Sequence, residues 1–410
     1  MFCCVEIRQR REKLSALLLK NCRIYNSPSG ENVSVLLRKG KIEGVFSTGQ
    51  EKSNGETRVI DCGGKILAPG FVDIHIQGAG GADFLDNSKE SIETICRTLP
   101  RFGVTGILAT TIVKDDIKNQ HLKLIAEFES DDRCTTNILG IHLEGPFINK
   151  SRRGGIDERS IMEPNMDYLE ELLENTGHRL KMMTIAPELS GMDRIIQRLI
   201  KENVVPSLGH SDAKYQEAIQ AFNIGVSHVT HIFNAMRPVH HREPGPIVAV
   251  FNSDEVTVQL ICDGAHVSPV MVNFLRKMVG DGRIALISDG ISGLGYNGRT
   301  LVYNNREYQV ENGTAIYPDG TFIGTVLSVA ELARRYMKYT GCGLVEAIES
   351  ISLVPLRIIG LDCKKGRVKE GYDADLVVVD EKLEIFLTII NGEVAYSRFK
   401  NNLNASANLI

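Results

Sequence analysis

The sequence has no pair of cysteines at zinc-finger spacing, no long basic run and no apolar segment of membrane-spanning length. Its nine cysteines are odd in number and scattered, so we predict neither a disulfide framework nor a zinc finger, and the cytoplasm fits best. The net charge of −4 and the pI near 6.2 make nucleic acid an unexpected partner. We expect no membrane association either.

The first residues carry no recognisable targeting signal. Glu6 and Glu12 stand among the arginines there, which argues against a signal peptide and a transit peptide. The adjacent Cys3 and Cys4 are no sufficient sign of lipidation. We therefore expect residues 1–16 to be an N-terminal extension and residues 399–410 to be a C-terminal tail.

The 410 residues exceed one average domain, although a barrel of alternating strands and helices takes about 250 residues as a single unit. Residues 17–68 show short strands between glycine-containing turns and no helical pattern. Residues 364–398 have the same character, with a hairpin signal at Asn391-Gly392. We expect these two segments to form one small β-sandwich domain.

Between them, residues 69–363 alternate between strand and helix. Eight apolar, β-rich runs are separated by helical segments, at residues 71–76, 104–110, 138–143, 182–186, 204–208, 226–232, 256–262 and 284–288. Eight such strands, apolar on both faces, predict an α/β fold with a closed (β/α)8, TIM-like barrel. Further on, we expect a hairpin excursion at residues 300–315 and helices at 329–339 and 344–360.

Two of these strands each end in a histidine, His210 and His231, with a helical pattern at residues 213–222 between them. A strand, helix, strand unit makes its two strands parallel, so both imidazoles should lie at the same end of the sheet. Two neutral imidazoles that converge there form the outline of a metal site.

Two carboxylates also stand at strand ends. Glu144 follows the third strand and completes, with the two histidines, a ligand set that suits Zn²⁺, Fe²⁺ or Co²⁺ with one position open for water. His142 lies on the same face as Glu144, and we interpret it as a packing residue. Asp289 ends the eighth strand before glycines that make a poor helix start, so we predict that it exchanges a proton with a metal-activated water.

The turn-like segment 240–245 contains Arg242 beside two histidines. A guanidinium binds phosphate through paired donors, so Arg242 is a candidate anion clamp. A solvated loop is the alternative, and the residues themselves leave it open.

Six motifs occur in an order that resembles the N-acetylglucosamine-6-phosphate deacetylases of the amidohydrolase superfamily, from about residue 17 to 395. They are His142-Leu143-Glu144-Gly145-Pro146-Phe147, Leu208-Gly209-His210-Ser211, Thr230-His231-Ile232-Phe233-Asn234-Ala235-Met236, His241-Arg242-Glu243-Pro244-Gly245, Asp263-Gly264-Ala265-His266 and Ser288-Asp289-Gly290. The first and third together are highly specific.

The resemblance implies that Glu144, His210 and His231 hold one divalent ion, with Zn²⁺ foremost and Fe²⁺, Co²⁺ or Mn²⁺ as alternatives, and that Asp289 is the acid/base. It implies an amino sugar phosphate as the partner and a set of substrate contacts: Gly155, Asn234, Ala235, Arg242, His266, Ile323, Gly324 and Thr325. Members of the family are usually homodimers that share the phosphate site, which makes Arg242 and His266 candidates to act across an interface.

The sequence departs from the family pattern in two places. His75 and Gln77 stand where relatives have His-x-His, for a second metal, or Gln-x-Asn. Because an amide is a weak ligand, we expect one tightly held ion, with His75 as a possible second-metal ligand. Ile156 stands where relatives often have a histidine, so a polar contact to the sugar is missing or comes from elsewhere.

The leading hypothesis from the sequence is hydrolysis of the acetamido group of N-acetylglucosamine 6-phosphate. Deacylation of a different N-acyl amino sugar phosphate is a second possibility, which Ile156 leaves open. A non-catalytic homologue that serves as a binding protein is a third, and the intact set of Glu144, His210, His231 and Asp289 argues against it.

Overall fold

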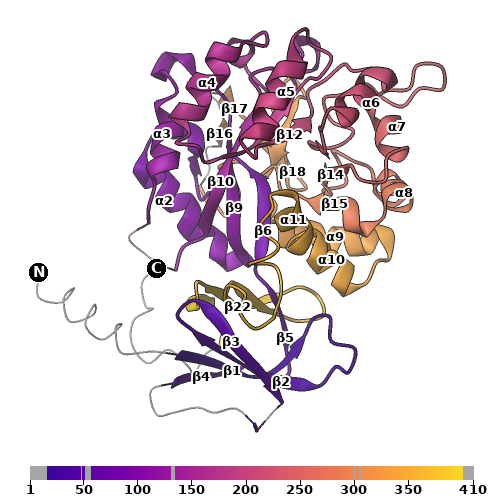
Figure 1. Ribbon diagram of the computed structural model, residues 1–410. Helices are drawn as coiled ribbons and strands as arrows, with labels where there is room; N and C mark the ends of the chain where they lie inside the picture. The colour runs from indigo at the N-terminus through magenta and orange to yellow at the C-terminus, as the bar shows by residue number, and fades with distance from the viewer. Residues whose placement is uncertain are drawn as a thin grey trace, which may run out of the picture.

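The computed structural model describes residues 16–47, 49–50, 57–130, 134–298, 301–303 and 306–399 (Figure 1). The expected N-terminal extension with Cys3 and Cys4, except for Ala16, lies outside the described residues, as do residues 400–410 of the expected tail.

Eight parallel strands form the centre of the molecule, hydrogen-bonded in the order β6, β9, β10, β11, β12, β13, β14, β15. Their bounds are β6 Phe71–Ile76, β9 Val104–Thr111, β10 Asn137–Glu144, β11 Leu180–Ile185, β12 Val205–Leu208, β13 His228–Val229, β14 Thr257–Leu260 and β15 Ile284–Leu286. Every predicted barrel strand is present, and the predicted fold class is confirmed. The strand expected at 226–232 is shorter, since the chain leaves the sheet after Val229.

The barrel closes where its last strand meets its first. The backbone N–H of Asp289 donates to the carbonyl of His75 at 3.0 Å, and that of Gln77 donates to Gly290 at 2.7 Å. These bonds lie just beyond β15 and at the end of β6, so closure occurs beside the strand-end residues that carry the candidate chemistry.

Helices surround the barrel (Figure 1). They are α2 Lys89–Thr98, α3 Gln120–Glu127, α4 Met166–Asn175, α5 Met192–Lys201, α6 Tyr215–Asn223, α7 Pro246–Phe251, α8 Pro269–Val279, α9 Val329–Thr340, α10 Leu344–Ser350 and α11 Leu353–Ile358. Short 3-10 turns occur at η1 Phe84–Asp86, η2 Leu99–Phe102, η3 Asp115–Ile117, η4 Lys150–Arg152, η5 Glu158–Ser160 and η6 Asp281–Arg283. In the α-helices, apolar residues recur at helical spacing: α5, for example, buries Ile195, Ile196 and Leu199.

The prediction of a single helix at 344–360 is wrong, because the chain forms α10 and α11 with a break at Ile351 and Ser352. Pro355 has no N–H to bond the carbonyl of Ile351, and its ring would clash with that carbonyl in a continuous helix. The carbonyl of Ile351 instead accepts a hydrogen bond from the backbone of Val72 at 2.7 Å. The break therefore ties this helical segment to the first barrel strand.

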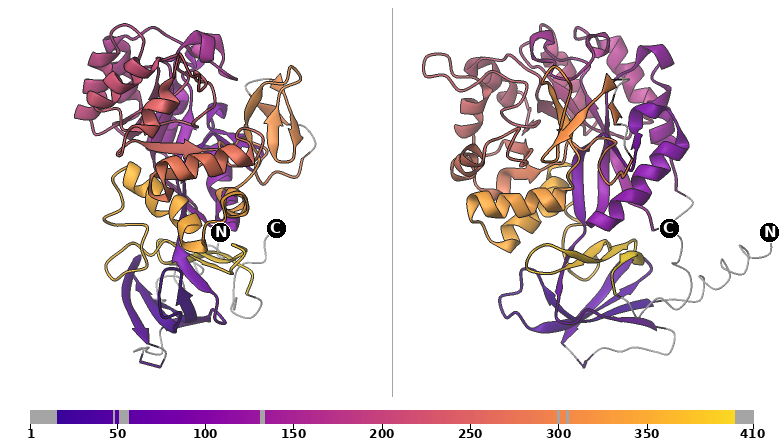
Figure 2. Two further views of the ribbon diagram at one scale, coloured as in Figure 1. Left: turned by 90° about the vertical axis from the view of Figure 1, so that its right-hand side faces the viewer. Right: turned by 180° about the vertical axis from the view of Figure 1, so that it is seen from behind.

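The excursion after β15 is longer than the expected hairpin at 300–315. It contains a two-stranded and a three-stranded sheet, from β16 Val302–Tyr303, β17 Arg306–Glu307, β18 Gln309–Glu311, β19 Thr314–Ile316 and β20 Phe322–Thr325. Figure 2 shows it projecting from one side of the barrel in orange. It returns to the barrel mouth, where Thr325 forms a bridge with Gly290. A short hairpin, β7 Gly78–Ala79 and β8 Ala82–Asp83, follows β6.

A second sheet contains strands from both ends of the described chain. Its members are β1 Ala16–Ile24, β2 Asn32–Arg38, β3 Lys41–Ser47, β4 Thr57–Asp61, β5 Ile66–Pro69, β21 Leu376–Val379, β22 Ile385–Ile390 and β23 Glu393–Ser397. Antiparallel pairing of β5 with β21 joins the two halves, and both halves bury side chains in one apolar cluster. We propose that residues 17–68 and 364–398 are a small domain below the barrel (Figure 1).

In the described part of the chain, no helix combines the length and apolar character needed to cross a bilayer.

The cluster of the small sheet should contribute strongly to stability. Val378 in β21 is fully buried there, and Val378→Ala should lower the free energy of unfolding by about 2 kcal/mol or more, because it removes buried methyl groups and leaves a cavity. Urea denaturation followed by circular dichroism measures this. Val45→Ala, the same change at a 37% exposed position of β3, should alter stability by less than about 0.5 kcal/mol. Equal effects would contradict the assignment of the core.

Candidate active site

The candidate residues stand directly beyond the barrel strands, at the carboxyl end of the sheet. His210, His231 and Asp289 follow β12, β13 and β15 and have φ values of +46°, +27° and +45°. Residues with a side chain rarely adopt this left-handed conformation, and such strain concentrates at functional sites. Each strand therefore ends in a residue whose backbone turns sharply at the mouth of the barrel.

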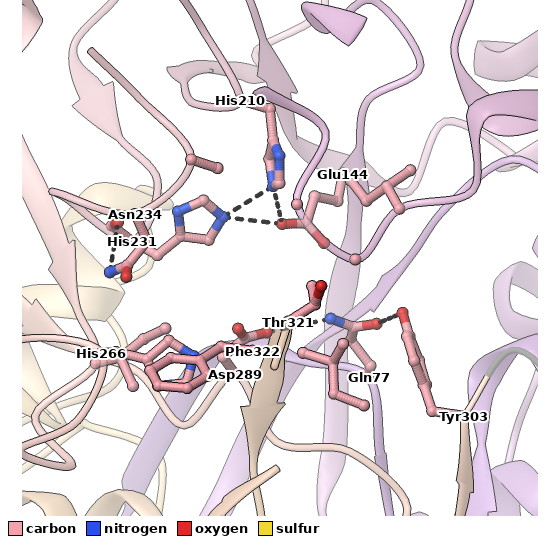
Figure 3. Close-up of a pocket in the computed structure, with 16 residues that line it drawn as sticks. Gln77, Glu144, His210, His231, Asn234, His266, Asp289, Tyr303, Thr321 and Phe322 are labelled. Atoms are coloured by element: carbon pink, nitrogen blue, oxygen red, sulfur yellow. Dashed lines mark hydrogen bonds and ion pairs between the residues drawn. The ribbon is translucent and has the colours of Figure 1, made fainter. Parts of the chain in front are cut away.

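Glu144 and the two histidines meet at one point (Figure 3). The Glu144 Oε1 atom lies 3.0 Å from Nε2 of His210 and 3.0 Å from Nε2 of His231, and the two nitrogens are 3.0 Å apart. All three side chains are buried. Of the groups formed by the described residues, this is the one with metal-binding geometry.

The hydrogen bonds of His210 show that this group fits a cation. Its Nδ1 lies 2.8 Å from the carbonyl oxygen of Arg152, which can accept and not donate. In a neutral imidazole Nδ1 then carries the proton, and Nε2 presents a bare lone pair to Glu144 and His231. Ligand atoms around a tetrahedral Zn²⁺ are about 3.3 Å apart, close to the separations found here.

The charges of these groups agree with a ligand role. Burial alone would raise the pKa of Glu144, but the imidazoles of His75, His210 and His231 outweigh it and hold the pKa well below its usual value. Burial lowers the pKa of His231 more than the Glu144 carboxylate raises it. Glu144 is therefore an anion and His231 is neutral, which are the forms that coordinate metals.

Asp289 faces this group across the same pocket (Figure 3). Its Oδ1 accepts a hydrogen bond from Nε2 of Gln77 at 3.1 Å. Its carbonyl accepts one from the backbone N–H of Thr325 at 2.9 Å. A Cβ at Gly324, where φ is +125°, would approach that carbonyl to 2.3 Å. Glycine at 324 thus lets β20 pack directly behind Asp289.

Asp73 and Ser288 support the same strand end. The Ser288 hydroxyl donates to Asp73, and the Asp73 Oδ1 atom accepts from the backbone N–H of His75 at 3.2 Å. Burial raises the pKa of Asp73 to about 6, although these hydrogen bonds oppose the rise. This fully buried link fixes β6 and β15 to each other immediately before Asp289.

His75 lies beside the site without belonging to the metal group. Its Nε2 is 3.3 Å from Oδ1 of Asp289 and 3.6 Å from Oε1 of Glu144, and it has no hydrogen-bond partner among the described residues. Burial acts to lower the pKa of His75, but these carboxylates outweigh it and raise the pKa to about 9. A second-metal role for His75 stays a prediction.

His142 packs behind the site, as its position on β10 predicted. Its Nε2 lies 2.8 Å from Oγ1 of Thr184, and its ring contacts the ring of His75 edge-on at 4.7 Å.

Five of the predicted substrate contacts line the pocket: Gly155, Asn234, Ala235, His266 and Ile323. Gly324 and Thr325 lie behind Asp289 instead: Gly324 packs against its carbonyl, and the backbone N–H of Thr325 donates to that carbonyl. Arg242 is exposed in the loop between β13 and α7 and is not among the residues that line the pocket of its own chain. No arginine or lysine of the described residues is among those lining residues.

A family model for the amidohydrolase family matches residues 66–403. The chain belongs to the amidohydrolase family. This confirms the resemblance that the motifs indicated.

Relatives of this amidohydrolase include the N-acetylglucosamine-6-phosphate deacetylase of Bacillus subtilis (strain 168). It is 32% identical over 386 residues, which cover 93% of this chain and 97% of the relative. The N-acetylgalactosamine-6-phosphate deacetylase of Escherichia coli O157:H7 is 30% identical over 333 residues, or 81% and 88% of the two chains. A Mycobacterium smegmatis deacetylase mutant, solved in complex with N-acetyl-D-glucosamine-6-phosphate, has a TM-score of 0.83 and 26% identity and covers 93% of this chain and 100% of its own.

The pocket of this amidohydrolase also contains residues that the sequence did not indicate. Tyr303, Thr321 and Phe322 come from the excursion, and Ile261 follows β14. Phe322 packs edge-on against His266, with 5.0 Å between the ring centroids. No motif or strand end marks Tyr303, Thr321 or Phe322, because a loop brings them to the mouth of the barrel.

If the buried triad holds the ion, Glu144→Gln should weaken metal affinity by more than about 100-fold, because an amide is a poor ligand. Elemental analysis after dialysis should find about one ion per wild-type chain and almost none in the variant. Glu158→Gln, the same change at an exposed glutamate, serves as the control. Full metal content in Glu144→Gln would remove Glu144 from the ligand set.

Proposed function

We propose that this amidohydrolase is a deacetylase that converts N-acetylglucosamine 6-phosphate and water to glucosamine 6-phosphate and acetate. The observation that carries the proposal is the pocket in which Glu144, His210 and His231 face Asp289 (Figure 3). Deacetylases of this substrate match 92% or more of the chain at about 30% identity, and a structural relative was solved with it bound.

Each residue then has a distinct task. Glu144, His210 and His231 would hold a divalent ion, which, when bound, polarises the acetamido carbonyl and makes water a stronger acid. Asp289 accepts a proton from the attacking water and returns it to the departing amine, so the carboxylate is restored at the end of the cycle. His266 and Asn234 lie at the rim, where they can bind sugar hydroxyls.

Two further assignments accompany this function. We favour Zn²⁺ as the ion, since one carboxylate and two imidazoles with an open position suit it, with Fe²⁺, Co²⁺ or Mn²⁺ as alternatives. We place the enzyme in the cytoplasm, because none of the seven cysteines within the described residues forms a disulfide.

A homodimer would complete the phosphate site. The substrate carries a dianionic group, yet the residues that line the pocket within one chain include no arginine or lysine among those described. Arg242 stands exposed on the loop before α7, where it could reach the pocket of a second copy. We propose that Arg242 forms the phosphate contact across a shared interface and that His266, which lines the pocket, contacts the sugar there.

N-acetylgalactosamine 6-phosphate is a second candidate substrate, because a deacetylase of that sugar is among the relatives. Ile156 is buried at the pocket and offers no side-chain hydrogen bond, so discrimination between sugar epimers would depend on neighbours such as Thr321. A purely binding role is disfavoured, because a non-catalytic protein has no need of Asp289 opposite an intact metal group.

Asp289→Asn should lower kcat by about 10²–10⁴-fold, because the amide cannot accept the proton, while the metal content stays normal. An acetate-release assay with metal analysis of the same preparation measures both. Asp254→Asn, at an exposed position, should behave as wild type. Near-normal turnover of Asp289→Asn would exclude the proton-transfer role.

Sharing of the phosphate site can be tested by subunit complementation. Arg242→Ala and Asp289→Asn chains should each be nearly inactive, whereas co-expressed chains should regain about a quarter of wild-type activity, since half of the dimers are mixed and each has one complete pocket. Co-expressed Glu144→Gln and Asp289→Asn chains are the matched control: because these two residues belong to the same pocket of one chain, both pockets of the mixed dimer keep a defect and activity should not return. Different affinity tags on the two chains show that mixed dimers form. No recovery with the Arg242→Ala chain, although mixed dimers are present, would place Arg242 in its own chain's pocket.

A further inference from the structure

A buried hydrogen-bonded chain leads from the excursion to the proton-transfer residue. The Tyr303 hydroxyl donates to Oε1 of Gln77, and Nε2 of Gln77 donates to Oδ1 of Asp289 at 3.1 Å (Figure 3). We propose that Gln77 and Tyr303 are positioning residues that orient Asp289 and take the place of a second cation beside it. This inference rests on the proposed function, in which Asp289 transfers the proton.

Asp289 and Tyr303 together determine which way the amide of Gln77 points. A carboxylate can only accept hydrogen bonds, so the NH₂ group must face Asp289. The carbonyl oxygen then faces Tyr303, whose hydroxyl has a proton to donate. All three side chains are buried, where an unpaired polar group costs about 1–3 kcal/mol. The two hydrogen bonds of Gln77 can therefore form together in only one orientation of its amide group.

Tyr303 is well suited to fix the orientation of the Gln77 amide. It is fully buried, and burial together with the carboxylates of Asp83, Glu144 and Asp289 raises the pKa of its hydroxyl well above the ordinary value, so the proton stays on the phenol. Its backbone carbonyl accepts a hydrogen bond from Tyr317 at 3.0 Å. The excursion thus delivers a rigid donor to the back of Gln77.

The contacts of Asp289 indicate what this achieves. Within the described part of the chain, Gln77 and His75 both approach Oδ1 of Asp289, at 3.1 and 3.3 Å. The carboxylate is held by one oxygen, which leaves Oδ2 for the proton. An orientation error at this atom would reduce proton transfer without weakening substrate binding.

The same arrangement disfavours a second ion. His75 Nε2 lies 3.3 Å from Oδ1 of Asp289 and 3.6 Å from Oε1 of Glu144. A cation there would need a further ligand from position 77. Gln77 instead directs N–H donors toward that place, because its oxygen is engaged by Tyr303. The N–H group of Gln77 and the imidazole of His75 thus both face Oδ1 of Asp289, where a second cation would otherwise lie.

Kinetics of matched variants test the positioning role. Tyr303→Phe should lower kcat by about tenfold and change KM by less than about twofold. Tyr308→Phe is the control, since Tyr308 is buried in the same excursion but its hydroxyl accepts from the backbone of Gly293. Thermal denaturation of both variants shows whether they lose similar stability. Equal kcat in the two variants would overturn the role of Tyr303.

A double-mutant cycle separates action through Gln77 from an independent effect. Gln77→Met keeps the length and removes the donor, and it should lower kcat at least as much as Tyr303→Phe does. The double variant should be no slower than Gln77→Met alone, because Tyr303 acts only through Gln77. Additive losses of kcat in the double variant would contradict the action of Tyr303 through Gln77.

Metal content gives a readout that does not depend on substrate. With excess Zn²⁺ followed by desalting, wild type should hold about one ion per chain and Gln77→His about two, because the imidazole supplies the missing ligand. Two ions in wild type, or one in Gln77→His, would overturn the claim that Gln77 excludes a second cation. Failure of wild type to cleave N-acetylglucosamine 6-phosphate would instead refute the proposed function.

Discussion

One carboxylate oxygen and two imidazole nitrogens that lie 3.0 Å from one another determine the rest of this structure. Glu144 is ionised, His210 is held in one tautomer by the carbonyl of Arg152, and His231 is neutral. In a buried site such a group is unfavourable unless a cation neutralises it. The barrel provides the rigidity that keeps three strand ends at this distance. The strained left-handed backbone at both histidines lowers the stability of the fold and is tolerated because the surrounding barrel holds it in place.

The same backbone hydrogen bonds close the barrel and position Asp289. The backbone bonds between Asp289, His75, Gln77 and Gly290 join the last strand to the first. Because these bonds belong to the residues that flank the pocket, a loose barrel would also be a misaligned site. The excursion adds a second support from outside, with Gly324 against the carbonyl of Asp289.

The sequence predicted those parts of the molecule that depend on regular patterns. Eight apolar runs predict the barrel, and the rule that parallel strands end at one edge predicts that Glu144, His210, His231 and Asp289 share one site. Periodicity did not show the break at Ile351, which follows from Pro355: the proline cannot bond the carbonyl of Ile351, and Val72 bonds it instead. Tyr303 was missed because it reaches Gln77 through a loop whose path no local signal encodes.

The pairing of β5 with β21 brings together segments that lie at opposite ends of the described chain. During synthesis, residues 16–69 leave the ribosome long before their partners at 376–397 exist. The early strands therefore keep unpaired edges throughout translation of the barrel. The small sheet can be completed only after the ribosome has translated its last strand.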